Sequence, residues 1–543
     1  MGTRQYIGAR YVPKFADPIA WDNTRSYEAL EIVTNLNTSY TSKKPVPVGI
    51  DITNSEYWVA TGNYNAQVEQ YHQEVVELEN AFNTSRAYIN LEDFGVTGSG
   101  DESDKMIDAV EFCSEHNIYE IVSHTDIMIS NVAISGSMTI DFNGHKIKGI
   151  RIHETTDRVK QMLTFEGGNV VIKNCVFEGY DDIVDTGEKP DMISPLFFNA
   201  CNSVHIMDCT FQNFDEMYYQ NMAADLVDRE ADLAKMQDCI YTEFNRCTVN
   251  NCKGHELFYV VANTLPREAV DGKMCNCTIT DINTSVVDFV GNNWYSENNI
   301  FDWDYDGSAV NVFALNLFVN ADQIKGDFKN VYDNCEAIYY QGNSVNIKNV
   351  KITGTIRLIP FELSAKDIVL ENIDYDVPAN KILLALRGGY QVDNPFKYGA
   401  ETALNSINAR VINCHSTNVR GALIYNSECS YGKATLIQCS FTGMSCVFIG
   451  DVEIVDCDIT PAIVDSQAPW GIFTPNVNVP NSIIVNGCRI NCTVAHDGYL
   501  IESDTHKAVV VGNICTATNA IAGCHNADAY VVSGNLGIED AAS

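Results

Sequence analysis

Positive charge is scarce in this sequence. The 543 residues include 35 Lys and Arg but 71 Asp and Glu, which gives a formal net charge of −36. Because nucleic-acid phosphates and anionic lipid surfaces are bound through clustered Lys and Arg, we expect neither nucleic acid nor a membrane surface as a partner. The chain also has no apolar run long enough to cross a bilayer, so no membrane insertion is expected.

Cysteine is absent from the first 112 residues, and all 19 cysteines lie at or after Cys113. Residues 1–8 contain no apolar signal-peptide region, and this combination predicts synthesis and folding in a reducing cytoplasm without a signal peptide. The cysteines lack the paired spacing of a zinc site, so we assign no metal to them. We expect them to be small buried hydrophobic residues.

The most regular feature of the chain is a recurring phrase of alternating apolar residues, a polar residue, a Cys and a further apolar residue. Clear copies occur at 171–177, 204–211, 245–249, 275–279, 411–414, 436–441, 454–459 and 485–490, with related lines at 347–352 and 369–375. Alternation at period two indicates a strand, and an Asn or Asp at the corner tolerates the left-handed backbone of a sharp turn. Copies that lie roughly 18 to 40 residues apart are typical of solenoid rungs. The sequence therefore predicts a mainly β solenoid with a column of buried thiols.

Residues 1–63 have a different design, in which aromatic residues punctuate short β-like runs. Trp21, Tyr27, Tyr40 and Trp58 occupy these places. Their spacing resembles that of the small type-three chitin-binding fold. Residues 43–47, however, stand where that family has an exposed aromatic pair. We therefore predict a small β-module used for docking, with carbohydrate binding as the alternative.

In residues 64–87 the spacing of the apolar residues changes. Apolar residues recur at alternating spacings of four and three, which is typical of a coiled-coil seam. The seam residues are Tyr64, Val68, Tyr71, Val75, Leu78 and Phe82. A helix this short is marginal alone, so we predict a coiled-coil neck where identical chains associate, with three as the expected number. A single amphipathic helix packed on its own domain is the alternative.

Residues 88–118 combine a strand, a Gly-rich turn and a helix for which Asp104 is the expected N-cap. The line carrying Asp93, Phe94, Gly95 and Gly98 resembles the start of pectate-lyase-like right-handed β-helices, in which a helix closes the solenoid. The resemblance extends over the rungs from about 88 to 536, and residues 119–543 are assigned to the right-handed parallel β-helix with inserted loops.

The order of module, neck, cap and rungs resembles that of tail spikes and appendages of bacteriophages. This resemblance implies a homotrimer on the virion tail, made in the host cytoplasm. It also implies an N-terminal module held by another virion protein, and a host cell-surface glycan that is bound and in many cases cleaved. A non-enzymatic structural or adhesive fibre is the alternative, and a cellular polysaccharide lyase is less favoured.

Insertions between rungs are the expected place for a glycan site, because sugar faces stack on aromatic rings and glycosidases use paired carboxylates. Our candidates for glycan binding are Trp294, Tyr295, Trp303 and Tyr305, with Tyr218 and Tyr219 from another insertion. Our candidate catalytic carboxylates are Asp302, Asp304, Asp306, Glu256 and Asp288. If there is a reaction, we expect a polysaccharide or teichoic-acid depolymerase, with hydrolysis favoured over elimination.

No cofactor is expected. Asp302, Asp304 and Asp306 begin like a calcium loop, which leaves calcium open as a ligand. The twelfth position is Phe313 instead of the bidentate Glu that such loops need.

Overall fold

The computed structural model of the chain forms two units, residues 1–87 and 88–543. The structure describes residues 3–7, 10–14, 19–36, 38–62, 88–150, 159–179, 192–214, 233–252, 256–282, 285–303, 310–326, 336–354, 359–376, 384–386, 407–416, 432–444, 446–448, 451–461, 471–475, 482–492, 499–501, 507–517, 519–524 and 529–542. The predicted neck, with Val68, Tyr71, Val75, Leu78 and Phe82, lies outside these residues.

The N-terminal unit contains two small sheets. Its strands are β1 (Thr3–Ile7), β2 (Arg10–Lys14), β3 (Ile19–Ala20), β4 (Ile32–Asn35), β5 (Thr38–Ser42) and β6 (Trp58–Gly62). Tyr27, Val33 and Trp58 are buried at its centre, and the rings of Tyr27 and Trp58 meet edge to face at 5.2 Å. The aromatic residues thus stabilise this unit by packing.

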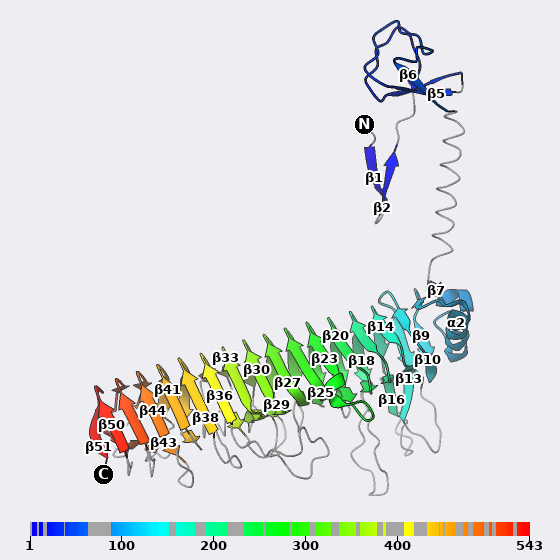
Figure 1. The fold of residues 1–543 in the computed structure, drawn as a ribbon. Helices are drawn as coiled ribbons and strands as arrows, with labels where there is room; N and C mark the ends of the chain where they lie inside the picture. The colour runs from blue at the N-terminus through cyan, green and yellow to red at the C-terminus, as the bar shows by residue number, and fades with distance from the viewer. Residues whose placement is uncertain are drawn as a thin grey trace. The chain divides into compact units, whose positions relative to one another are not determined.

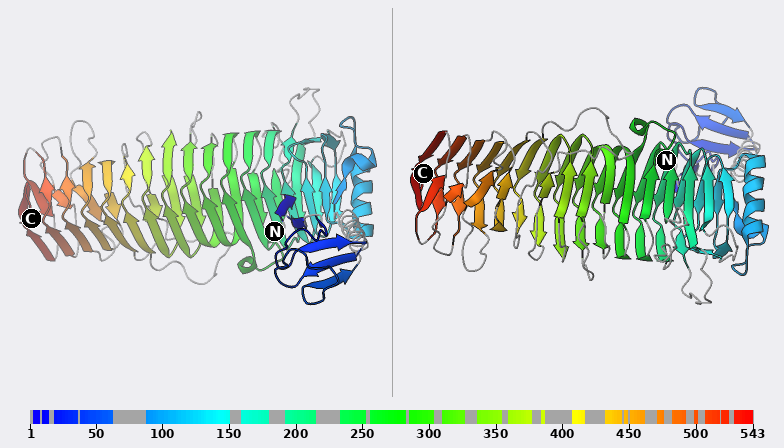
Figure 2. Two further views of the ribbon diagram at one scale, coloured as in Figure 1. Left: turned by 90° about the horizontal axis from the view of Figure 1, so that it is seen from above. Right: turned by 90° about the horizontal axis from the view of Figure 1, so that it is seen from below.

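The second unit is a right-handed parallel β-helix, as predicted (Figure 1). Within the described residues, most rungs pass through three strand positions, and the strands at each position stack into a parallel column (Figure 2). The first column contains β10 (Val132–Ser135), β13 (Val159–Glu166), β16 (Met192–Asn199), β19 (Ala234–Gln237), β22 (Glu256–Val261), β25 (Ser285–Glu297), β27 (Val310–Asn320), β29 (Glu336–Gln341), β32 (Ile359–Ser364) and β35 (Leu384–Leu386). A five-stranded sheet holds the same place in later rungs: β40 (Cys446–Phe448), β43 (Gly471–Pro475), β46 (Tyr499–Ile501), β49 (Ile521–Cys524) and β51 (Ile538–Ala542).

The second column carries the candidate site. It contains β7 (Tyr88–Asn90), β8 (Glu120–Val122), β11 (Met138–Asp141), β14 (Asn169–Lys173), β17 (Ser203–Met207), β20 (Tyr241–Asn245), β23 (Asp271–Cys275), β30 (Ser344–Lys348), β33 (Asp367–Glu371), β36 (Ile407–Ile412), β38 (Gly432–Ile437), β41 (Asp451–Val455), β44 (Ser482–Asn486), β47 (Lys507–Val511) and β50 (Ala529–Ser533). The long strands β25 and β27 run through both columns, because their first halves pair in the first column and their second halves in the second.

The third column completes each rung. It contains β9 (Ile127–Ile129), β12 (Lys146–Gly149), β15 (Val176–Glu178), β18 (Thr210–Phe214), β21 (Thr248–Cys252), β24 (Thr278–Ile282), β26 (Ile300–Trp303), β28 (Gln323–Gly326), β31 (Lys351–Gly354), β34 (Asp374–Asp376), β37 (His415–Ser416), β39 (Ser440–Met444), β42 (Asp458–Pro461), β45 (Arg489–Ile490) and β48 (Ile514–Cys515). A short helix η2 (Arg267–Ala269) precedes β23.

The corner between the second and third columns follows the predicted phrase. Asn174, Asn276 and Asn349 have φ of 54°, 56° and 55°, the left-handed conformation that the polar corner residue was expected to adopt. The next position is commonly a buried Cys, such as Cys209, whose Sγ donates to the Ile172 carbonyl on the preceding rung at 3.6 Å. Every described free cysteine is buried, as expected.

A helix covers the N-terminal end of the β-helix. The 3-10 helix η1 (Leu91–Phe94) is followed by α2 (Ser103–His116), which buries Met106, Ala109 and Cys113 against the core. The expectation that Asp104 is the N-cap was wrong, because the helix begins at Ser103 and Glu102 holds the N-cap position. The buried Glu102 carboxylate instead accepts the backbone N–H groups of Thr97 and Gly98, at 2.7 and 3.2 Å.

Candidate functional site

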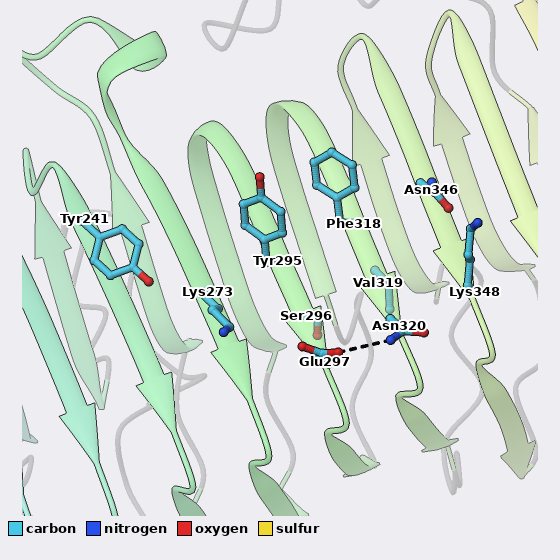
Figure 3. Close-up of a pocket in the computed structure, with 10 residues that line it drawn as sticks. All are labelled: Tyr241, Lys273, Tyr295, Ser296, Glu297, Phe318, Val319, Asn320, Asn346 and Lys348. Carbon is cyan, nitrogen blue, oxygen red and sulfur yellow. Dashed lines mark hydrogen bonds between the residues drawn. The ribbon is translucent and has the colours of Figure 1, made fainter.

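A groove of about 520 Å³ lies on the outer face of the second column (Figure 3). Strands β20, β23, β25, β27 and β30 line it side by side. The lining residues are Tyr241, Lys273, Tyr295, Ser296, Glu297, Phe318, Val319, Asn320, Asn346 and Lys348. Because five successive rungs contribute, the groove extends along the axis of the β-helix.

Two parallel aromatic rings form the apolar part of the groove. Tyr295 and Phe318 are register partners on β25 and β27, and both point outward because the residues beside them, Trp294 and Leu317, point into the core. Their ring centroids lie 4.9 Å apart and their planes differ by 8°. Both rings remain accessible, at 42% and 36% exposure. We call this pair the aromatic platform.

Polar groups surround the aromatic platform. The Glu297 carboxylate accepts a hydrogen bond from Asn320 Nδ2 at 3.2 Å, and Lys348 is paired with Glu371 of the next rung at 2.8 Å. Asn346 Oδ1 is buried and accepts no hydrogen bond from the described residues.

At the N-terminal end of the groove, Tyr241 lies beside an acid–base pair. Burial, and then the nearby Glu243 carboxylate, raise the pKa of Tyr241 to about 12, so its hydroxyl stays protonated at neutral pH. Glu243 Oε2 lies 3.0 Å from His205 Nδ1. This end of the groove therefore presents a neutral phenol next to the Glu243 carboxylate.

A buried polar cluster lies beneath the aromatic platform. Asp322 accepts the Asn299 backbone N–H at 2.8 Å and is also hydrogen-bonded to Ser296 Oγ. Asp322 is 1% exposed, and this burial raises its pKa to about 7. Asp322 occupies the position directly after the left-handed corner residue, where many other rungs have a Cys.

The two neighbouring aromatic candidates, Trp294 and Tyr295, lie on opposite faces of strand β25. Tyr295 lies in the groove, whereas the expectation that Trp294 contacts a glycan was wrong. Trp294 is fully buried and its ring packs on Phe289 with centroids 4.9 Å apart. Alternation along β25 sends one residue of the pair outward and the other into the core.

The other aromatic candidates cannot be placed. Tyr218, Tyr219 and Tyr305 lie outside the described residues. Trp303 ends β26, and only its backbone is described. Their assignment to a glycan site stays a prediction.

The carboxylate candidates do not converge in the described part of the chain. Asp302 lies on β26 in the third column, where its carboxylate is 3.3 Å from Lys325 Nζ. Asp288 lies on the first-column half of β25, and its Oδ2 accepts from Asn311 Nδ2 at 3.3 Å. Glu256 is buried at the start of β22. Asp304 and Asp306 lie outside the described residues.

Reasoning from the sequence missed Glu297, Phe318, Lys273 and Asn346 as groove residues. A signal for three of them was present: Lys273, Phe318 and Asn346, like Tyr295, each stand three residues before the left-handed corner of their rung. Aligning the rungs on that corner would have placed these side chains in one outward row.

The described residues show neither a metal cluster nor a membrane span. They contain no group of three or more His, Cys, Asp or Glu side chains that could hold a metal ion. No helix among them has the length and apolar character needed to cross a membrane.

Comparison with known proteins gave weak structural likenesses. No family model and no curated protein matches the chain. Tailspike protein 3 of bacteriophage CBA120 aligns with 97% of this chain and 79% of its own, at 11% identity and a TM-score of 0.31. An exopolygalacturonase from Thermotoga maritima aligns with 69% of this chain and 87% of its own, at 9% identity and a TM-score of 0.20. ORF18 of Geobacillus virus E2 aligns with 95% of this chain and 69% of its own, at 12% identity and a TM-score of 0.13.

Proposed function

We propose that this protein is a bacteriophage tail spike or related virion appendage that binds a host cell-surface glycan in the groove of the second column. The observation that carries this proposal is the aromatic platform, in which Tyr295 and Phe318 hold exposed parallel rings 4.9 Å apart on adjacent rungs. Exposed aromatic rings on a rigid sheet favour stacking with the apolar faces of sugars.

The polar surroundings of the aromatic platform suit a polyhydroxylated ligand. Glu297 presents acceptors, and Lys273 and Lys348 present donors on either side of the rings. Since the rings and these groups follow one another along the rungs, a glycan chain would lie along the β-helix axis and contact several rungs at once.

The N-terminal unit fits attachment to another virion protein better than sugar binding. Trp58 and Tyr27 are buried and offer no face to a sugar, whereas Leu30 and Leu36 are 78% and 93% exposed. Both leucines also have positive φ, of 68° and 48°, which is an unfavourable backbone conformation for this residue type. Strained and exposed apolar residues favour a docking role for this unit. In the proposal the unit docks onto a phage tail protein, and the spike on the virion is a homotrimer.

The groove supports binding more directly than cleavage. A glycosidase needs two carboxyl groups at a defined separation, and Glu297 is the single carboxylate among the described residues that line the groove. Depolymerisation would therefore depend on another site, such as that predicted around Asp302, Asp304 and Asp306. A non-enzymatic adhesive fibre is the second candidate, and it differs from a depolymerising tail spike only in the absence of cleavage.

The test is incubation of the purified chain with wall polysaccharides of candidate hosts, followed by measurement of bound glycan, chain length and new end groups. Saturable binding supports the proposal, and new reducing ends, unsaturated ends or phosphate ends would identify hydrolysis, elimination or teichoic-acid cleavage. The decisive host is one that the purified chain protects from infection. If the chain does not bind the wall polysaccharide of that host, the proposal is contradicted.

A further inference from the structure

Lys273 is a groove lysine whose ammonium group has no partner among the described residues. It lies half-buried on β23, in register with Glu243 of β20 and with Tyr295 of the aromatic platform (Figure 3). No hydrogen bond or ion pair joins its Nζ atom to another residue in the described part of the chain. Lys348, at the other end of the groove, is by contrast paired with Glu371 at 2.8 Å.

The two carboxylates that flank Lys273 turn toward other groups. Glu243 Oε2 lies 3.0 Å from His205 Nδ1, and Glu297 accepts a hydrogen bond from Asn320 Nδ2 at 3.2 Å. Lys273 therefore has an acidic residue on either side and forms an ion pair with neither of them.

An unpaired lysine is unexpected in this chain. Its 71 Asp and Glu outnumber its 35 Lys and Arg, and a half-buried charge without a counter-charge costs free energy. The net charge of −36 repels anions at a distance, but at physiological ionic strength charges more than about 8 Å away are largely screened. The local arrangement therefore decides what the groove binds, and at Lys273 it leaves one positive charge for a ligand.

We propose that Lys273 binds an acidic group of the glycan, a carboxylate or a phosphate, while a neighbouring sugar stacks on the aromatic platform. An ammonium group forms charge-assisted hydrogen bonds with the oxygens of either anion. Glu297 lies on the strand of Tyr295 and would repel a second acidic group there. The ligand class is thus a glycan with spaced acidic groups, and this inference rests on the proposed function of the groove.

The assignment is tested with Lys273→Gln, which removes the charge, and Lys273→Arg, which keeps it. Lys433→Gln is the matched control, because Lys433 is exposed on β38 of the same column and lies outside the groove. The probe is the wall polysaccharide of a host that the purified chain protects from infection. Lys273→Gln should weaken its binding at least tenfold, because a hydrogen bond between charged groups is lost, whereas the other two variants should bind within threefold of the wild type.

Chemical treatment of the polysaccharide identifies the acidic group. Carbodiimide-activated reduction with borohydride converts uronic acid carboxylates into alcohols, and hydrofluoric acid removes phosphate esters. One of the two treatments should weaken binding by the wild type at least tenfold. On that treated polysaccharide the wild type and Lys273→Gln should have equal affinity, since the group that Lys273 binds is gone.

Two results would overturn the inference. One is equal binding of the untreated polysaccharide by Lys273→Gln and the wild type. The other is an equal loss by Lys273→Gln on treated and untreated polysaccharide, which would mean that the substitution acts without an acidic group. Tyr295→Ala combined with Phe318→Ala separates this inference from the proposed function: if that variant loses binding and Lys273→Gln does not, the groove binds the glycan and only the assignment of Lys273 fails.

Discussion

Gly272 makes room for Trp294. The two residues are register partners on β23 and β25, and a Cβ atom on Gly272 would lie only 2.6 Å from Cε3 of Trp294. Trp294 is fully buried in consequence, while its neighbour Tyr295 stands outside. The missing side chain of Gly272 thus leaves space for the Trp294 ring, which strand alternation directs into the core while Tyr295 faces the groove.

Replacing this glycine tests the relationship. We expect Gly272→Ala to destabilise the protein by about 1–3 kcal/mol, because the added methyl overpacks the Trp294 and Phe289 rings. Denaturant unfolding measures the change. Trp294→Leu should remove most of the penalty of Gly272→Ala, so the two substitutions should be strongly non-additive. Additive effects would show that the methyl group clashes elsewhere.

The left-handed corner gives a second prediction. Asn349 has φ of 55°, donates to Asn320 Oδ1 at 2.8 Å and accepts from Asn372 Nδ2 at 2.9 Å. Asn349→Val should lower the free energy of unfolding by about 2–3 kcal/mol, because it loses these bonds and places a β-branched residue in the left-handed region.

Asn349→Gly is the matched control for that substitution. Glycine also loses the side-chain hydrogen bonds but adopts the left-handed backbone without strain, so a loss of about 1 kcal/mol is expected. Equal losses for valine and glycine would show that the backbone conformation of the corner contributes little.

The buried carboxyl group of Asp322 predicts a pH dependence. Folding raises the pKa of Asp322 from 3.8 to about 7, so as the pH rises the unfolded chain loses this proton first. The contribution of Asp322 to stability should therefore fall between about pH 4 and pH 7 and stay constant above that range.

Asp322→Asn removes this titration while keeping the shape of the side chain. The stability of the variant relative to the wild type should rise between pH 4 and pH 7, by at most about 4 kcal/mol. Unfolding curves of both proteins at several pH values measure the difference. A difference that does not change with pH would mean that Asp322 is ionised in the folded protein throughout this range.

Much of the fold could be predicted from the sequence because the same physical demand recurs in every rung. Each corner needs a residue that tolerates positive φ, followed by a small buried one, and residues such as Asn174 and Cys175 carry that pattern locally. The site could be predicted only in part. Tyr295 was identified from its own segment, but its partner Phe318 comes from the next rung, and the burial of Trp294 depends on Gly272. Such contacts are set by register between rungs, which no single segment contains.

The central claim, that Tyr295 and Phe318 bind a glycan, is tested most directly by binding isotherms of three full-length proteins. These are the wild type, Tyr295→Ala combined with Phe318→Ala, and Tyr119→Ala, whose tyrosine is 54% exposed and lies outside the groove. Loss of stacking at both rings should weaken binding of the host polysaccharide by at least tenfold, while Tyr119→Ala binds as the wild type does. Unchanged affinity in the folded double variant would contradict the account and move glycan recognition to another face of the molecule.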